Sequence, residues 1–260
     1  MLTPVPPRPL PHWVTDVPLA HRGLWSDDGP PENSLAAFAA ARDAGVGVEL
    51  DVHVTADGVP VVVHDHDLER VAGVRFDVRR GTVDELREHA LRDGTCVPTL
   101  VEVLDVLGDA PVMVEVKNLD RGWGRMEPLV AAVLDDHARR AYVASFHPGT
   151  LRWFRLHRPN LLRAQTASGT WDAQVPAVMG RALSWMLLNG RSLPHMLSYD
   201  VQNLRHPVVR RWRARGGVVV AWTARTEADV AAAAAHADNL IFEGIDPPVW
   251  PPHRRSDDRA

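Results

Sequence analysis

Short runs of apolar and β-branched residues alternate with segments of helical periodicity along almost the whole chain. We predict strands at 18–23, 47–55, 112–117, 142–146, 162–166, 196–200, 218–223 and 239–242. We predict helices at 34–44, 100–107, 127–137, 149–157, 175–188, 207–215 and 227–236. This alternation is typical of an α/β fold in which helices cover a parallel sheet. Eight strands favour a closed (β/α)8 barrel of the TIM type, and 260 residues is close to the roughly 250 that one such barrel needs.

The composition favours a protein that handles a small molecule. The net charge of -4 gives no broad basic field for a nucleic-acid backbone. The single cysteine, Cys96, excludes an internal disulfide and fits a reducing compartment. No stretch approaches the ~18 to 20 apolar residues of a membrane span. We therefore expect a cytoplasmic protein with a small-molecule partner, no bound nucleic acid and no stable membrane insertion, of unknown oligomeric state.

One domain is expected over residues 1–260, with its core at about 17–246. The start of the chain is rich in proline, and the polar tail 247–260 is expected to be partly disordered. Residues 65–98 form a predicted loop with one short helix near 83–91. The predicted domain therefore has irregular ends and one long connection after the second strand.

The segment VELDVHVTADGVPVVVHD at 48–65 interrupts the alternation of strands and helices. It contains two β-rich runs separated by Asp57-Gly58, a pair that favours a two-residue hairpin turn. We predict a β-hairpin excursion after the second strand. Counting outward from a two-residue turn places His64 opposite Asp51, with their Cβ atoms ~5 Å apart. The hairpin alone is therefore expected to bring this histidine and this aspartate together.

Three acidic residues lie on predicted strands that otherwise consist of valine and leucine. Glu49 and Asp51 are two residues apart on the second strand and so share a face, and Glu115 lies near the end of the next. Three carboxylates that meet would repel one another unless a cation neutralised them. The oxygen ligands indicate a divalent cation such as Mg²⁺ or Ca²⁺ rather than zinc. The simpler alternative is that these acids form structural salt bridges with nearby arginines.

His21 and His64 are the predicted pair for proton transfer, since each ends a β-rich run close to these acids. A histidine pair beside a phosphate can supply the base and the acid that break a P–O bond. With 13 histidines in the chain, either one taken alone is as readily structural. Arg22 and Lys117, the only lysine, are candidate substrate-binding cations, and their alternative role is to pair with the acids.

Several residues have weaker claims to a function. Trp222 ends the seventh strand and is a candidate for stacking on the substrate, with burial against helices as the alternative. Asn33 or Ser34 is expected to cap the first helix rather than contact substrate. His147 and Asp200 follow strand ends and are minor candidates. His53 is either a surface residue or a partner of the acidic group.

These residues lie in motifs that resemble those of the glycerophosphodiester phosphodiesterases. The motifs are HRG at 21–23, PENS at 31–34, the ELDV-to-HD hairpin at 48–65, PTL at 98–100, VEVK at 114–117, ASF at 144–146 and AWT at 221–223. They occur in the family's order and cover roughly 19–242. The hairpin is the most specific of them.

The resemblance implies a TIM-type barrel with a divalent cation on Glu49, Asp51 and Glu115. It implies acid and base roles for His21 and His64, without saying which is which, and phosphate contacts at Arg22 with Lys117 nearby. The implied reaction converts a glycerophosphodiester into glycerol 3-phosphate and an alcohol. A neighbouring glycerol hydroxyl would attack phosphorus, and water would open the cyclic product.

The chain departs from the family pattern in two places. The last strand usually closes with threonine and aspartate, whereas Phe242 and Glu243 stand there, which bears on recognition of the alcohol or glycerol. The first loop also contains Trp25, Asp27 and Asp28, which reshape the entrance. The competing hypotheses are a phospholipase-like or sphingomyelinase-like phosphodiesterase acting on a lipid headgroup, and a phosphate-binding barrel without turnover.

Overall fold

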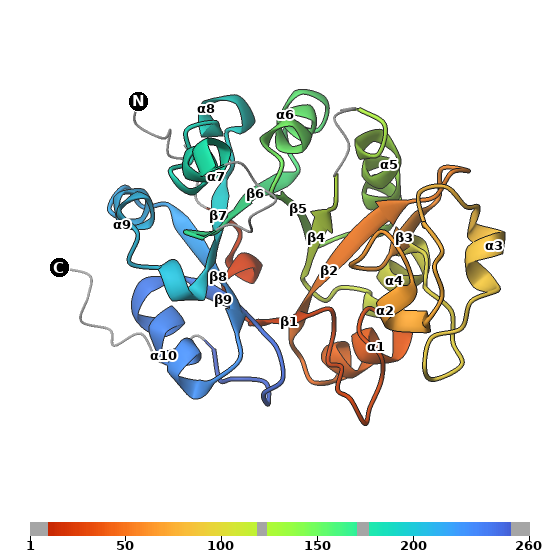
Figure 1. Ribbon diagram of the computed structural model, residues 1–260. Coiled ribbons are helices and arrows are strands. Elements are labelled where there is room, and N and C mark those ends of the chain that lie inside the picture. Colours follow the sequence, from red (N-terminus) through yellow and green to blue (C-terminus); the bar gives the residue numbers. More distant parts are fainter. Residues whose placement is uncertain (1–9, 119–123, 171–176, 251–260) are drawn as a thin grey trace.

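The protein folds as a closed barrel of parallel strands surrounded by helices (Figure 1). The computed structural model describes residues 10–118, 124–170 and 177–250. The strands are β1 (Leu19–His21), β2 (Gly47–Val54), β3 (Pro60–Val62), β4 (Val112–Val116), β5 (Ala141–Ser145), β6 (Leu162–Ala167), β7 (Met196–Asp200), β8 (Val218–Ala224) and β9 (Asn239–Phe242). The ring runs β1-β2-β4-β5-β6-β7-β8-β9 and closes because β1 pairs in parallel with both β2 and β9. The predicted barrel is confirmed.

Helices cover the outside of this ring (Figure 1). They are α1 (Leu35–Asp43), α2 (Glu69–Ala72), α3 (Val83–Arg87), α4 (Leu100–Leu107), α5 (Glu127–His137), α6 (Pro148–His157), α7 (Ala177–Ser184), α8 (Asn189–Ser192), α9 (Pro207–Arg213) and α10 (Glu227–His236), with 3-10 turns η1 (His12–Val14) and η2 (Val201–Asn203). Most lie within two residues of the prediction. The helix predicted at 175–188 is α7, which ends at Ser184 because Met186 turns the chain with a φ of 55°. Residues 175 and 176 of that prediction lie outside the described ranges.

Side-chain caps explain why two of these helices begin where they do. The Ser34 hydroxyl accepts a hydrogen bond from the backbone N–H of Ala37, so Ser34 is the predicted cap of α1. Thr99 and Glu102 form a capping box at the start of α4. Each cap fixes the start of its helix, after a segment that leads away from the carboxyl end of a strand.

The alternation of side chains along β2 divides the core into two layers. Val48, Leu50 and Val52 belong to the large apolar cluster between sheet and helices, together with Phe38 of α1 and Leu104 of α4. The residues between them therefore face the inside of the ring. A second apolar cluster fills the lower part of that interior: Leu19, Met113, Tyr142, Ala144, Ala164, Met196, Val220 and Ile241. Polar groups at the carboxyl ends of the strands consequently lie above a closed apolar floor.

The hairpin after β2 forms, but its register differs by one residue from the prediction. Val52 pairs with Val62, whereas the two-residue turn would pair it with Val63. The Thr55 N–H donates to the Val59 carbonyl at 3.1 Å across a three-residue turn, in which Gly58 has a φ of 89°. A three-residue loop with glycine in the left-handed region is the other hairpin that Asp57-Gly58 supports.

The predicted pairing of Asp51 with His64 is therefore wrong. The Asp51 carbonyl instead accepts from the Val63 N–H at 3.0 Å, and His64 follows the end of β3 in the loop. Being outside the ladder, His64 is not held on one face of the sheet by strand pairing. Its side chain is held by other contacts, described below.

Two remaining predictions concern the ends of the molecule and membranes. Most of the predicted tail 247–260, like the proline-rich start, lies outside the described residues. Among the helices that the structure describes, none combines the length and the apolar character needed to cross a bilayer. The short helix predicted near 83–91 is α3, which ends at Arg87.

Candidate active site

Three carboxylates converge inside the barrel at the carboxyl ends of β2 and β4. Glu49 and Asp51 lie on β2, and Glu115 lies on β4 directly beside Asp51 in the strand register. All three are buried, and one oxygen of each lies within 4.8 Å of the others. Ligand oxygens at about 2.1 to 2.5 Å around one ion stand at most about 5 Å apart, so this spacing fits a single divalent cation.

Two cations already accompany these acids. Lys117 Nζ lies 2.9 Å from Asp51 Oδ1 and 2.6 Å from Glu115 Oε1, and Arg22 Nε lies 3.3 Å from Asp51 Oδ2. Burial opposes the charge on Lys117, but Asp51 and Glu115 outweigh it and raise the pKa of the ammonium. The alternative pairing of acids with cations thus holds for Asp51 and Glu115. Within the described ranges no lysine or arginine pairs with Glu49, whose Oε2 lies 3.7 Å from His21 Nε2.

Glu49 is the carboxylate that best tests the fit to a metal. Its Oε2 atom is buried and has no hydrogen-bond partner among the described residues. Burial, with Asp51 and Glu115 close by, raises the pKa of Glu49 well above its usual range. The opposite holds for Asp51, whose pKa is lowered despite burial because Lys117, His64 and Arg22 surround it. An oxygen that is buried, has no hydrogen bond and is crowded by like charge is suited to bind a divalent cation.

The two histidines approach this group from β1 and from the loop after β3. His21 Nε2 lies 3.7 Å from Glu49 Oε2, and His21 Nδ1 lies 3.2 Å from Glu243 Oε1, just past β9. His64 Nδ1 donates to Asp65 Oδ1 at 2.8 Å, which leaves its Nε2 as the nitrogen available to a ligand. Burial lowers the pKa of His64, although Asp51 opposes the shift, so the neutral ring is favoured.

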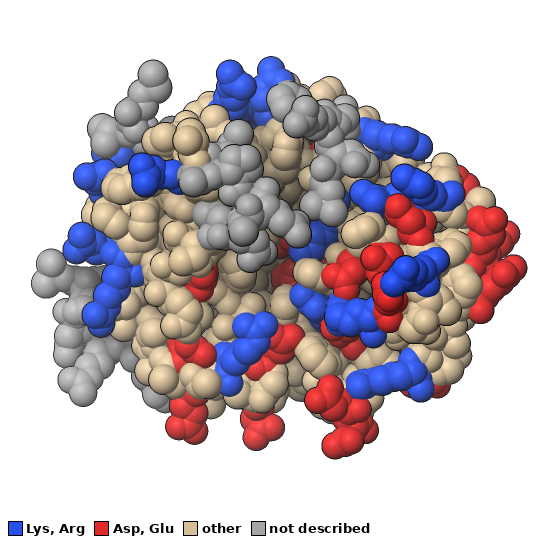
Figure 2. All heavy atoms as spheres, in the orientation of Figure 1, with Lys and Arg blue, Asp and Glu red and all other residues tan. Residues whose placement is uncertain are grey.

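An ion-pair network joins the partners of Arg22 and His64. Arg22 Nη1 donates to Glu32 Oε1 at 3.0 Å, and Asp65 accepts from His64. Arg70 of α2 bridges the two acids: its Nη1 lies 2.7 Å from Glu32 Oε2 and its Nε lies 2.7 Å from Asp65 Oδ2. Figure 2 shows acidic and basic side chains mixed over the region that Figure 1 labels β2 and α2. The network fixes two segments of the site relative to each other.

Comparison with known proteins identifies the family. The sequence profile of the glycerophosphoryl diester phosphodiesterase family matches residues 21–245. The chain belongs to this family. The resemblance expected from the motifs is thereby confirmed.

Individual members of the glycerophosphoryl diester phosphodiesterase family agree. A glycerophosphodiester phosphodiesterase of Caldanaerobacter subterraneus subsp. tengcongensis is 31% identical over 155 residues, which are 55% of this chain and 63% of that protein, less than two thirds of its length. A probable glycerophosphodiester phosphodiesterase 2 of Mycobacterium tuberculosis is 31% identical over 80% of this chain and 79% of that protein. A crystal structure of the Thermotoga maritima glycerophosphodiester phosphodiesterase superposes with a TM-score of 0.68 at 26% identity, covering 86% of this chain and 92% of that one.

Most of the predicted site residues of this protein lie together. Contacts or charge interactions connect His21, Arg22, Glu49, Asp51, His64, Glu115 and Lys117. Trp222 lies on β8, packed edge-on against Phe146 with ring centroids 5.6 Å apart and against the apolar cluster inside the barrel. Its Nε1 is buried and has no hydrogen-bond partner in the described ranges.

The weaker candidate residues from the sequence have hydrogen-bond partners in the structure. Asn33 Nδ2 donates to Asp51 Oδ2 at 3.3 Å, so it steadies the acidic group, while Ser34 supplies the cap. Asp200 accepts from Ser168 and caps η2. His53 is fully buried, and its Nε2 donates to the His64 carbonyl at 3.0 Å. His53 is therefore a partner of the site rather than a surface residue.

Sequence reasoning missed the carboxylates that hold the histidines. Asp65 belongs to the HD motif, and its position next to His64 is the available indication. The departure from the family pattern at Glu243 bears on alcohol or glycerol recognition, and the structure also places this carboxylate against His21. An ion pair with Arg225 holds the Glu243 carboxylate in place. Burial opposes ionisation of Glu243, yet His21 and Arg225 lower its pKa to about 2.

Proposed function

We propose that this protein is a divalent-metal-dependent phosphodiesterase that hydrolyses glycerophosphodiesters to glycerol 3-phosphate and an alcohol. The observation that supports it most is the convergence of three buried carboxylates with an imidazole on the same barrel mouth. Membership of the glycerophosphoryl diester phosphodiesterase family supports the same reaction.

Glu49, Asp51 and Glu115 would hold the cation, Mg²⁺ or Ca²⁺, which supplies Lewis-acid stabilisation of negative charge on the phosphoryl oxygens. Arg22 presents a guanidinium to the phosphate, and Lys117 adds a second positive charge beside the acids. Both side chains are oriented in advance by their carboxylate partners, so little reorganisation is needed when substrate binds.

His21 and His64 form the acid and base pair in this proposal. One imidazole removes the proton from the attacking hydroxyl as its oxygen bonds to phosphorus. The other protonates the alcohol oxygen as the P–O bond to the leaving group breaks. Each ring has a carboxylate at Nδ1, Glu243 for His21 and Asp65 for His64, so each presents its Nε2 to the reaction. Trp222 is proposed to line the substrate side of the mouth.

The decisive experiment measures release of glycerol 3-phosphate from glycerophosphocholine with and without Mg²⁺ or Ca²⁺. We expect metal-stimulated hydrolysis, and a loss of about 10²- to 10⁴-fold in kcat for His64→Ala, because one proton transfer is removed. His66→Ala is the matched control, since His66 is a more exposed histidine of the same loop that pairs with Asp67 rather than with the acidic centre. Absence of metal-stimulated hydrolysis on every diester tested would favour the phosphate-binding barrel instead.

One observation favours the lipid-headgroup alternative. Val178 on α7 is 85% exposed, and Trp185, seven residues further on and directly after the helix, is 38% exposed. Leu187, just beyond α7, is 64% exposed. An exposed apolar face of this kind suits contact with lipid. Hydrolysis of lysophosphatidylcholine in vesicles faster than glycerophosphocholine in solution would establish that function in place of the one proposed.

A further inference from the structure

A pocket of about 940 Å³ adjoins the candidate active site between the loop after β1 and the segment after β9. Gly23 and Glu243 line it on the side of the site: Gly23 follows Arg22, and Glu243 contacts His21. Its size falls within the range of small-molecule sites. The pocket therefore lies where one arm of a bound phosphodiester could extend beyond His21.

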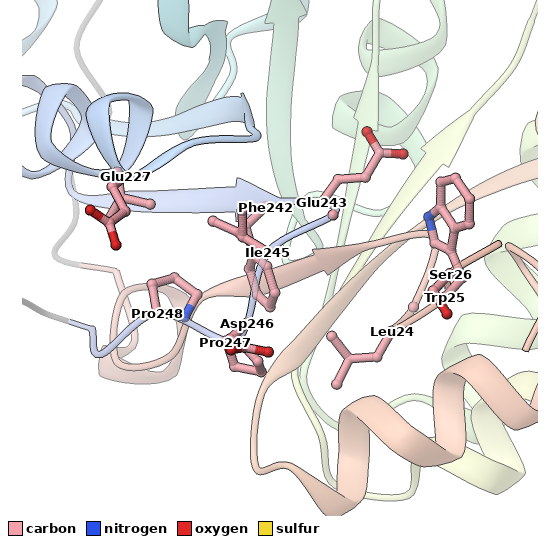
Figure 3. Close-up of a pocket in the computed structure, with 13 residues that line it drawn as sticks. Leu24, Trp25, Ser26, Glu227, Phe242, Glu243, Ile245, Asp246, Pro247 and Pro248 are labelled. Atoms are coloured by element: carbon pink, nitrogen blue, oxygen red, sulfur yellow. The ribbon is translucent and has the colours of Figure 1, made fainter. Parts of the chain in front are cut away.

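Three of the departures from the family pattern line this pocket. Trp25 stands on the loop after β1, Phe242 ends β9 and Glu243 follows it. Figure 3 shows the Trp25 ring and the Glu243 carboxylate rising from opposite sides, with Leu24 and Ile245 lower in the view. Residues that differ from the usual pattern thus gather around one cavity.

The walls combine apolar surface with negative charge. Leu24, Trp25, Phe242 and Ile245 contribute apolar surface, as do two prolines, and no lysine, arginine or histidine is among the described residues of the lining. The lining acids are Glu227, Glu243 and Asp246. Glu243 is neutralised by Arg225 and His21, whereas no described cation lies within ion-pair distance of Glu227 or Asp246. The pocket therefore retains two carboxylates without a cation partner among the described residues, and both are exposed and lie across the pocket from the Trp25 ring (Figure 3).

Trp25 gives an independent indication of a ligand. Its Nε1 is buried and has no hydrogen-bond partner among the described residues. A buried indole N–H normally finds an acceptor, so an oxygen of a bound molecule is a suitable partner. The face of the same ring attracts cations, and alkylated ammonium groups are favoured where apolar contact is also available.

We propose that this pocket receives the alcohol portion of the substrate and selects amino alcohols, such as choline or ethanolamine, over uncharged polyols. The inference rests on the proposed function for its placement of the scissile bond. The carboxylates attract the ammonium, the apolar walls accept its alkyl groups, and the Trp25 N–H is available to an ester or alcohol oxygen. A polyol carries neither the positive charge that the carboxylates attract nor the alkyl groups that the apolar residues accept.

The test compares choline with its uncharged isostere 3,3-dimethyl-1-butanol as inhibitors of glycerophosphodiester hydrolysis. We expect choline to inhibit more tightly, by roughly two- to fivefold for each cation contact. The difference should shrink with added salt and in Asp246→Asn, Glu227→Gln and Trp25→Leu. In parallel, the ratio of kcat/KM for glycerophosphocholine over glycerophosphoinositol should fall in these variants.

Asp28→Asn is the matched control, because Asp28 is an exposed acid on the same loop that does not line the pocket. Equal inhibition by choline and its isostere, or an unchanged substrate ratio in all three variants, would overturn the proposal while leaving the phosphodiesterase function intact. If no diester is hydrolysed, calorimetric titration of the protein with choline and with the isostere still decides the matter. Equal affinities would overturn the proposal, and tighter binding of choline that weakens in Asp246→Asn would support it.

Discussion

Arg70 illustrates how a residue outside the proposed reaction determines the geometry of the site. Its guanidinium joins Glu32, the partner of Arg22, to Asp65, the partner of His64. Glu32 and Asp65 are far apart in the sequence, so the Arg70 bridge directly couples the segment that holds Arg22 to the segment that holds His64. Arg70 is in this view a positioning residue.

Replacing Arg70 with glutamine should therefore lower kcat by about tenfold with a smaller change in KM, because small displacements of reacting groups are costly to the rate. Arg70→Lys should recover part of the loss: it keeps the charge but cannot bridge two carboxylates with a planar fork. Steady-state kinetics on glycerophosphocholine measures both. Arg75→Gln, at an 86% exposed arginine in the same loop, is the control that should retain wild-type kcat. Equal kcat values for Arg70→Gln and the control would contradict the positioning role.

Glu32 gives a prediction about pH and stability. Burial opposes its ionisation, but Arg70 and Arg22 prevail and lower the pKa of Glu32 below its usual 4.5. A carboxyl whose pKa is lower in the folded state stabilises the protein above that usual pKa, and the contribution is lost as the pH falls through the folded value. Glu32→Gln should therefore cost about 1 to 3 kcal/mol at pH 7, since two arginines lose a partner. Urea unfolding should show this difference shrinking as the pH falls below about 4.5; a constant difference would contradict it.

At the scale of secondary structure, the sequence predicts the features that depend on a local pattern of residues. The prediction fails where the same residues fit two local conformations of similar energy. The strand β2 was predictable because Val48, Leu50 and Val52 must be buried and their alternation leaves Glu49 and Asp51 on the inner face. The hairpin register was not, because Asp57-Gly58 fits a two-residue or a three-residue turn. That choice shifts every partner by one residue.

His64 shows why the error in register does not displace the site. Its orientation depends on Asp65 at Nδ1 and on His53, whose ring donates to the His64 carbonyl, rather than on a cross-strand pair. Both partners are specified by tertiary packing. The sequence could thus suggest that His64 belongs to the site, but it could not give the contacts that keep it there.

At the scale of the whole molecule, closure of the barrel creates contacts that no local pattern contains. The pairing of β9 with β1 brings Glu243 to His21, from opposite ends of the sequence. The same closure forms the pocket between Trp25 and Ile245. Sequence motifs identified both segments, but only the ring arrangement shows that they share one cavity and that Glu243 contacts His21.

We expect the acidic centre to make the stability of the entire barrel depend on a divalent ion. The three carboxylates should stabilise the fold when the ion is bound and destabilise it when the ion is removed. A cation at 100 times its Kd adds about 2.7 kcal/mol to the folded state, which raises the Tm of a barrel of this size by roughly 5 to 10 °C. Differential scanning calorimetry with Mg²⁺ or Ca²⁺ measures this rise, and Glu49→Gln should abolish most of it by removing one ligand. In EDTA the same variant should melt above the wild type, because folding then buries three carboxylates together and the pKa of Glu49 is raised by that crowding. Glu88→Gln, at an exposed acid, should change neither value. A Glu49→Gln protein that is less stable than wild type in EDTA would mean that this carboxylate is a structural partner in its own right, and the case for an ion at its unpaired oxygen would fail.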